Sequence, residues 1–358
     1  MSLCFIGSIT WKGGVEVSML GKKAELLPGE IGELHRFLRS GFGEGSASLD
    51  EDVLAWKYFG RQDIDQPVSF IMRDSFGNIC AHVGATYAQF VCDGRKDKPL
   101  RAMFPTDWLS TQPGAGLKLM NMALADNSIL YAIGGTHDAD RALRAVRCKQ
   151  VGSLVRMCRF PSSRGAISYS FQCGGSCFRK VARAARNMIH SLAPLADEKP
   201  PVQLLRISEF KEADMMQATD QGVHTVSSPS QLNHLLRHPR NVISGWRIYY
   251  GSSAIGYALL CVLPDPLPIR GKIVECQLST RDPLIWAGLL AALTKQLTLM
   301  GATIITSLVS TQFLQSAFEI NNYRCCGTSN LLVRSSMMHL FESSRITLSL
   351  REGDISYV

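Results

Sequence analysis

The segment Ser128-Ile-Leu-Tyr-Ala-Ile-Gly-Gly-Thr136 is an apolar run that ends in two glycines and a threonine, and its recurrence later in the chain decides how the chain is divided. Such a run predicts a buried strand that leads into the start of a helix. A segment of the same character, Ala302-Thr-Ile-Ile-Thr-Ser-Leu-Val-Ser-Thr311, lies about 175 residues further along. We therefore predict that one structural unit occurs twice.

The elements around these two strands follow the same order. An amphipathic helix is predicted after each strand, over residues 137–148 and 312–322, and a glycine and a hydrophobic strand come next. These glycines, Gly152 and Gly327, are 175 residues apart. Upstream, a strand, a tight turn and a second strand predict a β-hairpin in each half. A repeated order of elements constrains a fold more tightly than residue propensity does.

Each unit is predicted to be an α/β fold of the α+β kind. Antiparallel pairs come first and a β-α-β crossover follows, so each sheet should be mixed, largely antiparallel and twisted, with helices flanking it. The predicted organisation is an N-terminal extension (1–20), a first domain (21–165), a basic linker helix (166–200), a second domain (201–345) and a C-terminal tail (346–358).

Length and composition fit two globular domains. A chain of 358 residues is too long for one ordinary core, and a hydrophobic content of 46% excludes wholesale disorder. The eleven cysteines are scattered and odd in number, so we expect free thiols in a cytoplasmic protein, without a disulfide framework or a metal site. We predict neither a signal peptide nor membrane insertion, because the apolar stretches are short or carry polar residues such as Lys295.

The net charge of +8 is concentrated in one stretch. Between Arg156 and Arg186 there are seven arginines or lysines and no acid. Such a surface could favour nucleic acid, an anionic membrane surface or a phosphorylated ligand, although a solvated linker helix is the simpler interpretation. On the helix predicted over residues 177–192, we expect arginines to face outward and apolar residues inward. These residues are Arg179, Arg183 and Arg186 outward and Val181, Ala185 and Met188 inward.

The element order, with a glycine-rich turn opening the central helix, resembles the GNAT (GCN5-related N-acetyltransferase) superfamily. The segment Trp56-Lys57-Tyr58 before the hairpin is similar to one that recurs in tandem members. The resemblance covers nearly the whole chain, once per half. It implies an acyl-CoA-dependent N-acyltransferase, with acetyl-CoA or another acyl-CoA as cofactor. It also implies a small amine as acceptor, such as an amino sugar or an amino acid, and a catalytic N-terminal copy.

The turn before the central helix carries the cofactor part of this resemblance. The family motif, Arg/Gln-x-x-Gly-x-Gly/Ala, holds the pyrophosphate of coenzyme A on backbone N–H groups at a helix N-terminus. Here the segment is Thr111-Gln-Pro-Gly-Ala-Gly-Leu-Lys118, which departs from the motif at its proline and its lysine. The cofactor-binding candidates are Gln112, Gly114, Ala115, Gly116, Leu117 and Lys118. Gly116 is expected to require glycine both for access to the amides and for a positive φ.

The matching turn of the second half differs. Ser279-Thr-Arg-Asp-Pro283 has no glycine, and its aspartate would repel a phosphate. This copy is therefore expected to be degenerate and to lack the cofactor.

Three residues of the first half are the catalytic candidates. Acyl transfer to an amine needs a neutral amine, a polarised carbonyl and a proton source for the departing thiolate. Asp107 could deprotonate an ammonium or bond the loop as a structural residue. His82 lies on the second hairpin strand and Tyr131 beside the expected thioester, and a buried structural role is the alternative for both. His137, at the start of the next helix, is a weaker candidate.

Lys57 and Tyr58 are the candidates for contact with the acceptor. Two other functions stay open at this point. A peptidyltransferase-like protein that uses aminoacyl-tRNA would explain the basic linker, although the sequence does not favour nucleic acid. A non-catalytic binding protein built on two decayed GNAT domains would explain the altered turn.

Overall fold

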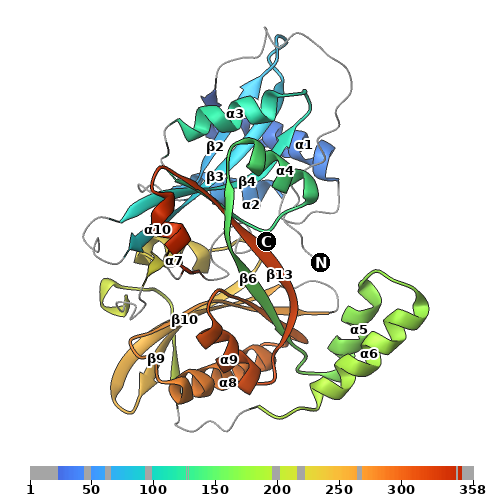
Figure 1. Cartoon of the computed structure of the whole chain (residues 1–358), viewed down its shortest axis with the longest axis vertical. Helices are drawn as coiled ribbons and strands as arrows, with labels where there is room; N and C mark the ends of the chain where they lie inside the picture. Colours follow the sequence, from blue (N-terminus) through green and yellow to red (C-terminus); the bar gives the residue numbers. More distant parts are fainter. Residues whose placement is uncertain are drawn as a thin grey trace.

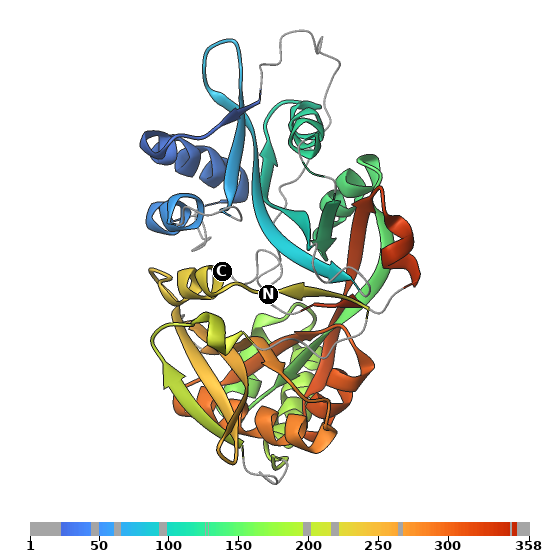
Figure 2. The same cartoon turned by 90° about the vertical axis from the view of Figure 1, so that its left-hand side faces the viewer.

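The chain forms two similar halves stacked along its long axis (Figures 1 and 2). The structure is a computed structural model that describes residues 23–43, 50–60, 66–92, 99–125, 127, 129–195, 202–215, 222–263, 268–343 and 346–348. The predicted N-terminal extension and almost all of the predicted tail lie outside these residues.

The first half follows the predicted order of elements. It contains β1 (Ala24–Glu25), α1 (Ile31–Phe42), α2 (Glu51–Phe59), β2 (Val68–Arg73), β3 (Ile79–Cys92), β4 (Leu100–Ser110), α3 (Ala115–Leu124), β5 (Ile129–Ile133), α4 (His137–Ala145) and β6 (Lys149–Arg159). Two helices, α5 (Ser163–Gln172) and α6 (Cys177–Ser191), connect it to the second half.

The second half has a similar order, but its described residues contain one α-helix before the hairpin where the first half has two, an additional strand near the start, and a short helix and strand at the end. It contains β7 (Val202–Ile207), β8 (Val223–Val226), α7 (Pro229–Leu236), β9 (Val242–Tyr250), β10 (Ser253–Leu263), β11 (Arg270–Leu278), α8 (Pro283–Leu299), β12 (Ile304–Val309), α9 (Gln312–Ile320), β13 (Arg324–Ser335), α10 (Met338–Ser343) and β14 (Ile346–Thr347).

One mixed sheet runs through both halves in the order β1-β2-β3-β4-β5-β13-β6-β12-β11-β10-β9-β7. The central pair of this order is β13 and β6, and the five strands on one side of it correspond in order to the five on the other side. The strands β5 and β12, which come from the two segments quoted at the start, are the first on each side. Each pairs in parallel with the strand before its helix, β4 or β11. The predicted mixed sheet flanked by helices is confirmed.

The last strand of each half is exchanged with the other half. β13 pairs with β5 of the first half, and β6 pairs with β12 of the second. β6 and β13 also pair with each other in antiparallel fashion, and Figure 1 shows them side by side between the two halves. Because a buried strand needs a partner on both edges, each half completes its sheet with the other half's strand.

The hydrophobic cores are joined by the same exchange. The core of the first half includes Leu331, Leu332 and Val333 of β13, while that of the second half includes Met157 of β6. A further contact joins α2 to α7, because the Trp56 ring stacks on His234 with 4.3 Å between ring centroids. The halves therefore share apolar burial as well as backbone hydrogen bonds.

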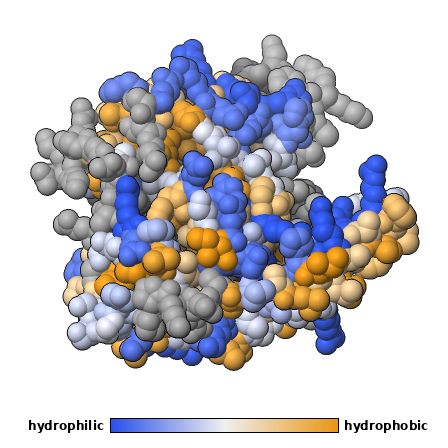
Figure 3. Space-filling view, turned by 60° about the horizontal axis from the view of Figure 1, so that its bottom comes forward, coloured by the Kyte–Doolittle hydropathy of each residue, from blue (hydrophilic) through white to orange (hydrophobic). Residues whose placement is uncertain are grey.

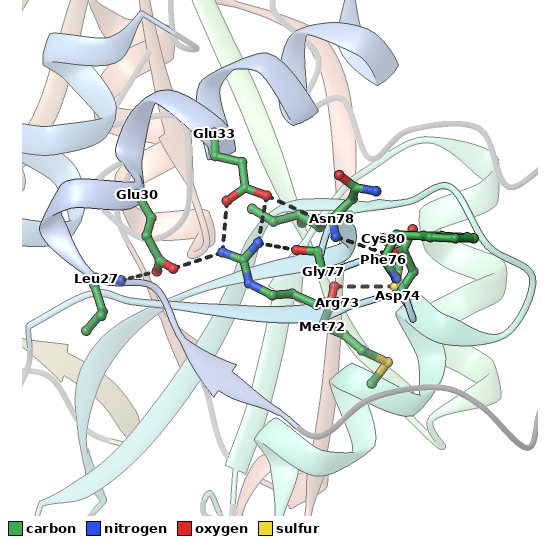
Figure 4. Close-up of polar contacts among 11 residues, drawn as sticks. Leu27, Glu30, Glu33, Met72, Arg73, Asp74, Phe76, Gly77, Asn78 and Cys80 are labelled. Atoms are coloured by element: carbon green, nitrogen blue, oxygen red, sulfur yellow. Dashed lines mark hydrogen bonds and ion pairs between the residues drawn. The ribbon is translucent and has the colours of Figure 1, made fainter.

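A charged network fastens α1 to the β2–β3 hairpin (Figure 4). The guanidinium of Arg73 donates hydrogen bonds to both carboxylate oxygens of Glu33, at 2.7 and 2.9 Å, and to Glu30 at 2.9 Å. It also donates to the Gly77 carbonyl in the hairpin turn, at 2.7 Å. The hydrogen bond from Arg73 is the main cause that lowers the pKa of Glu33. This bidentate geometry fixes the angle of α1 against the sheet.

The connection between the halves differs from the sequence prediction. A second helix, α5, precedes the predicted one and packs against it as a helical hairpin. Arg179 and Arg186 are exposed as expected, but Arg183 is half-buried and donates to the carbonyls of Ser170 and Gly174. The inward prediction was wrong for its three apolar residues. Val181, Ala185 and Met188 all face solvent.

Within the described residues, no helix combines the length and the apolar character that a membrane span requires. In the same part of the chain, no group of three or more histidine, cysteine or acidic side chains is arranged to hold a metal ion. The ten described cysteines are free thiols, whereas Cys4 lies outside the described residues.

Candidate functional site

The candidate cofactor site lies where β4 and β5 separate. These strands are in register at a single parallel pair, Met103 with Leu130, and β4 then continues to Ser110. In the second half, β11 and β12 pair over three residues from Arg270 before they part. In each half the pairing of the two parallel strands is therefore short, and the following helix begins beyond the paired residues.

The turn that opens α3 presents a helix N-terminus without a side-chain cap. Gly114 occupies the N-cap position in the left-handed region, with φ +79° and ψ −20°. Because the N-cap residue is a glycine, it makes no side-chain hydrogen bond to the first-turn amides. Such amides and the positive end of the helix dipole form a suitable environment for a phosphate. Lys118 is half-buried one turn into the helix and would add a positive charge.

Gly116 has a different role from the expected one. It is a buried residue of α3 with ordinary helical φ, so a positive φ does not explain the glycine. A Cβ at this position would lie 3.0 Å from both Trp108 Nε1 and Ser110 Cβ. Glycine at 116 therefore allows α3 to pack closely on β4, while Gly114 supplies the unusual backbone conformation.

The turn that opens α8 is capped by its own aspartate. Asp282 accepts a hydrogen bond from the Leu284 amide at 2.8 Å, and Thr280 accepts one from the Asp282 amide at 3.1 Å. The carboxylate thus occupies the position that a phosphate would need. The two turns therefore differ in geometry, and the assignment of the cofactor to the first copy stays a prediction.

Four of the predicted catalytic and acceptor-contacting residues meet at a bulge in β4. The register between β3 and β4 shifts between His82 and Gly84, and Asp107 adopts φ +48° within this bulge. The Asp107 carboxylate accepts hydrogen bonds from Lys57 Nζ at 2.9 Å and from the Tyr58 hydroxyl at 2.6 Å. Lys57 also donates to Thr106 Oγ1 at 2.5 Å.

His82 lies on the other side of this bulge. Its Nδ1 is 2.7 Å from the backbone oxygen of Asp107, which can only accept, so Nδ1 carries the proton. Nε2 therefore accepts from the Ser69 hydroxyl, at 2.9 Å. The hydrogen bonds hold the imidazole in one tautomer against the bulge.

Burial governs the ionisation of this cluster, because Lys57, Tyr58, His82 and Asp107 are all buried. Burial lowers the pKa of His82 to about 4, against a smaller opposing effect of Asp107, so the imidazole is neutral at pH 7. Burial alone would raise the pKa of Asp107. The charge of Lys57 and the bonds from Tyr58 and Lys57 outweigh it and hold that pKa below its usual range.

The remaining candidates lie apart from the cluster. Tyr131 is buried in the core of the first half, with its ring packed edge-on against Phe90 and Phe104. His137 is exposed in the first turn of α4, whose N-cap is Thr136.

The second half contains a cavity that the sequence did not reveal. It has a volume of about 170 Å³ and is lined by residues of β11 and β12, by the ends of α8 and α9, and by β8 and β14. Trp286, Phe313 and Phe318 give it aromatic walls, and Glu275 contributes a buried carboxylate. The strands β11 and β12 that line it hold the places in the second half that β4 and β5 hold in the first.

Glu275 is the polar centre of this cavity. Its Oε1 accepts hydrogen bonds from Ser227 Oγ at 2.6 Å and from the Tyr257 hydroxyl at 2.7 Å. Each half thus carries a buried carboxylate on the strand that precedes its central helix, β4 or β11, and this carboxylate accepts from a tyrosine, Asp107 from Tyr58 and Glu275 from Tyr257. In the sequence, Glu275 is the single acidic residue of an apolar strand, which could have indicated a functional carboxylate. The absence of a glycine turn in this half directed the prediction to the first half instead.

These two units, with their shared sheet and helix-opening turns, define a tandem GNAT-like fold. No protein-family model matches the chain, and no curated protein matches it in sequence. Among solved structures, it is similar to a probable N-acyltransferase from Enterococcus faecalis, with a TM-score of 0.56 and 12% identity over 89% of this chain and 74% of that one.

Two further structures extend this similarity. The N-myristoyltransferase of Saccharomyces cerevisiae with bound myristoyl-CoA has a TM-score of 0.56 and 10% identity, over 91% of this chain and 85% of that one. A tandem GNAT protein from the clavulanic acid biosynthesis pathway has a TM-score of 0.52 and 7% identity, over 88% of this chain and 98% of that one. The resemblance to a GNAT-like fold in two copies is confirmed.

Proposed function

We propose that this protein is an acyl-CoA-dependent N-acyltransferase that acts on a small amine such as an amino sugar or an amino acid. The fold supports the proposal, because its structural neighbours include N-acyltransferases. The observation that carries it is the uncapped glycine turn of α3, which follows β4 beyond its parallel pairing with β5. Backbone amides at such a place are suited to the pyrophosphate of coenzyme A.

In this proposal the N-terminal copy binds acetyl-CoA or another acyl-CoA. The residues that would hold its pyrophosphate are those of the turn and the first turn of α3. They are Gln112, Gly114, Ala115, Gly116, Leu117 and Lys118. The bound acyl-CoA supplies an activated thioester carbonyl. The protein's own part is to orient that group along β4 and to provide hydrogen bonds beside it.

We assign Asp107 and His82 to the β4 bulge next to the reacting groups. The Asp107 carboxylate would accept the proton that the amine loses as its nitrogen attacks the thioester carbonyl, while neutral His82 keeps the bulge in one conformation. Lys57 and Tyr58 hold the carboxylate in place, so their contribution to acceptor binding acts through Asp107.

The cavity supports a second candidate, in which the C-terminal copy carries the chemistry. Its carboxylate, Glu275, is within a cavity with aromatic walls, whereas the Asp107 carboxylate is enclosed by Lys57 and Tyr58. In that case the amine would be deprotonated by Glu275. The capped turn at Asp282 argues against coenzyme A in this copy.

Calorimetric titration with acetyl-CoA and with longer acyl-CoA esters tests the proposal. We expect Lys118→Glu to weaken binding at least about tenfold, because it places a negative charge beside the pyrophosphate. The matched change at the other turn, Asp282→Asn, should leave the affinity unchanged. An effect of Asp282→Asn or Glu275→Gln, with none of Lys118→Glu, would place the ligand in the C-terminal copy.

A protein that binds no acyl-CoA ester would contradict both candidates. Retention of RNA that falls as salt rises would then favour the aminoacyl-tRNA alternative, because phosphate contacts release counterions.

A further inference from the structure

The helical hairpin of α5 and α6 carries a hydrophobic stripe that faces solvent. On α6 the stripe recurs at helical spacing through Phe178, Val181, Ala185, Met188 and Leu192, and it therefore lies along one face. Phe178 is 83% exposed and Leu192 is 77% exposed. A stripe of this length is normally the face that a helix buries.

The buried face of α6 is instead small and polar. Ala184 and Asn187 are its buried residues. The Asn187 side chain donates to Ser170 Oγ of α5 at 2.9 Å and accepts from Arg324 of β13 at 2.6 Å. These fully bonded polar contacts fix the orientation of α6, so the exposed stripe is not the result of a loosely attached helix.

The helix α5 is held equally firmly and adds to the apolar surface. A Cβ on Gly165 would lie 2.1 Å from the Thr303 oxygen, so α5 packs closely against the second half. Ile167 and Phe171, one turn apart, are exposed. Figure 3 shows hydrophobic atoms over the lobe that projects at its right-hand side, which is where the hairpin lies in Figure 1.

The charge around the stripe has one sign. Arg164 of α5 and Arg179 and Arg186 of α6 are exposed, and Lys180 is partly exposed. From residue 141 to residue 196 the sequence contains no aspartate or glutamate. On an α-helix with 100° per residue, Arg186 and Arg179 lie roughly 120° and 140° from the centre of the apolar stripe. Both side chains are exposed and long, so their aliphatic stems can extend along the helix surface toward the headgroup level while the stripe is immersed.

We propose that the α5–α6 hairpin docks on the surface of a lipid bilayer that contains anionic headgroups. The apolar stripe would lie at the boundary between headgroups and acyl chains, and the arginines would contact lipid phosphates. Positive charge without acids selects an anionic surface, and an exposed stripe of large apolar side chains requires an apolar medium. This proposal does not depend on the acyltransferase proposal.

Co-sedimentation of the full-length protein with phospholipid vesicles tests the docking. We expect binding to phosphatidylcholine vesicles that contain one quarter phosphatidylglycerol, and weak binding to phosphatidylcholine alone. The triple variant Phe178→Ser, Val181→Ser, Leu192→Ser should have a vesicle partition coefficient more than about tenfold lower than that of the wild type. The double variant Arg179→Gln, Arg186→Gln should lose roughly thirtyfold on anionic vesicles, and its remaining binding should depend less steeply on salt than that of the wild type.

Matched variants on other surfaces control for general hydrophobicity and charge. Phe76→Ser, Leu205→Ser, Leu299→Ser removes three exposed apolar side chains elsewhere, and Arg206→Gln, Arg141→Gln removes two exposed charges. Both control proteins should bind as the wild type does. All substituted side chains are exposed, so the melting temperatures should stay close to that of the wild type.

Two results would overturn the proposal. One is a wild-type protein whose sedimentation with anionic vesicles is no greater than with phosphatidylcholine vesicles. The other is a wild-type dimer, measured by light scattering, that the triple serine variant converts to a monomer, because the stripe would then be an interface between two copies of this chain.

Discussion

The ammonium of Lys57 lies 2.9 Å from the carboxylate of Asp107, and both side chains are buried in the first half of the molecule. The two residues come from α2 and from the β4 bulge, so this ion pair joins the helical layer to the sheet where the strands part. A buried pair of this kind costs a large desolvation penalty, and removal of one partner leaves an uncompensated charge.

A double-mutant cycle on this pair should show strong coupling. We expect Lys57→Met to lower the free energy of unfolding by about 3–5 kcal/mol, because the Asp107 carboxylate would stay buried without its cation. Asparagine is the suitable partner change, since it tolerates the φ of +48° at position 107. Lys57→Met, Asp107→Asn should be less destabilised than the sum of the single variants, as measured by urea unfolding. Additive losses would show that the ion pair does not contribute as a unit.

Stability should fall between pH 6.5 and pH 4 because of His82. Its pKa is about 4 in the folded protein and 6.5 as the ordinary value, so the unfolded chain binds the additional proton in this range. Stability therefore rises with pH through this window, and the full effect is about 3 kcal/mol. Asp107 acts at lower pH. Its folded pKa lies below the ordinary 3.8, so its contribution is lost only as the pH falls below that value.

The variant His82→Asn isolates the histidine. Its amide can replace Nδ1 as the donor to the Asp107 carbonyl, but it does not titrate. Its unfolding free energy should change less than that of the wild type between pH 7 and pH 4. Parallel profiles for the two proteins would show that another group dominates the acid sensitivity.

The strand exchange predicts that the halves depend on each other. Residues 1–200 alone lack β13, which leaves the buried strand β5 with an open edge. We expect this fragment, and residues 201–358 alone, to aggregate or to stay partly unfolded by size exclusion and circular dichroism. When co-expressed, they should purify as a one-to-one complex. Two stable, well-folded monomeric fragments would refute this dependence.

The two glycines of the α3 turn should respond differently to substitution. Gly116→Val should cost about 1–3 kcal/mol of stability, because its side chain would collide with Trp108 and Ser110. Gly114→Ala has open space around its Cβ but a φ of +79°, and should cost about 1–2 kcal/mol through backbone strain. Thermal unfolding measures both. If the melting temperature of Gly116→Val equals that of the wild type, α3 does not pack on β4 as closely as described.

The local sequence determined most of the elements and their repetition. Apolar periodicity and turn residues predicted α6 over residues 177–192, and it is observed over Cys177–Ser191. They also predicted the equivalent strands β5 and β12 and the difference between the turns at Gly114 and Asp282. These features depend on residues that are close together in the chain, so a single sequence is sufficient to reveal them.

The tertiary structure alone decided the exchange of β6 and β13, the meeting of Lys57 with Asp107, the cavity around Glu275 and the face that α6 exposes. An apolar strand is equally suited to either sheet, because its pattern specifies burial but not a partner. Likewise, the stripe on α6 predicted an inward face, but the bonds of Asn187 to Ser170 and Arg324 turned it outward. Contacts between residues far apart in the chain depend on the assembled packing, which local periodicity does not encode.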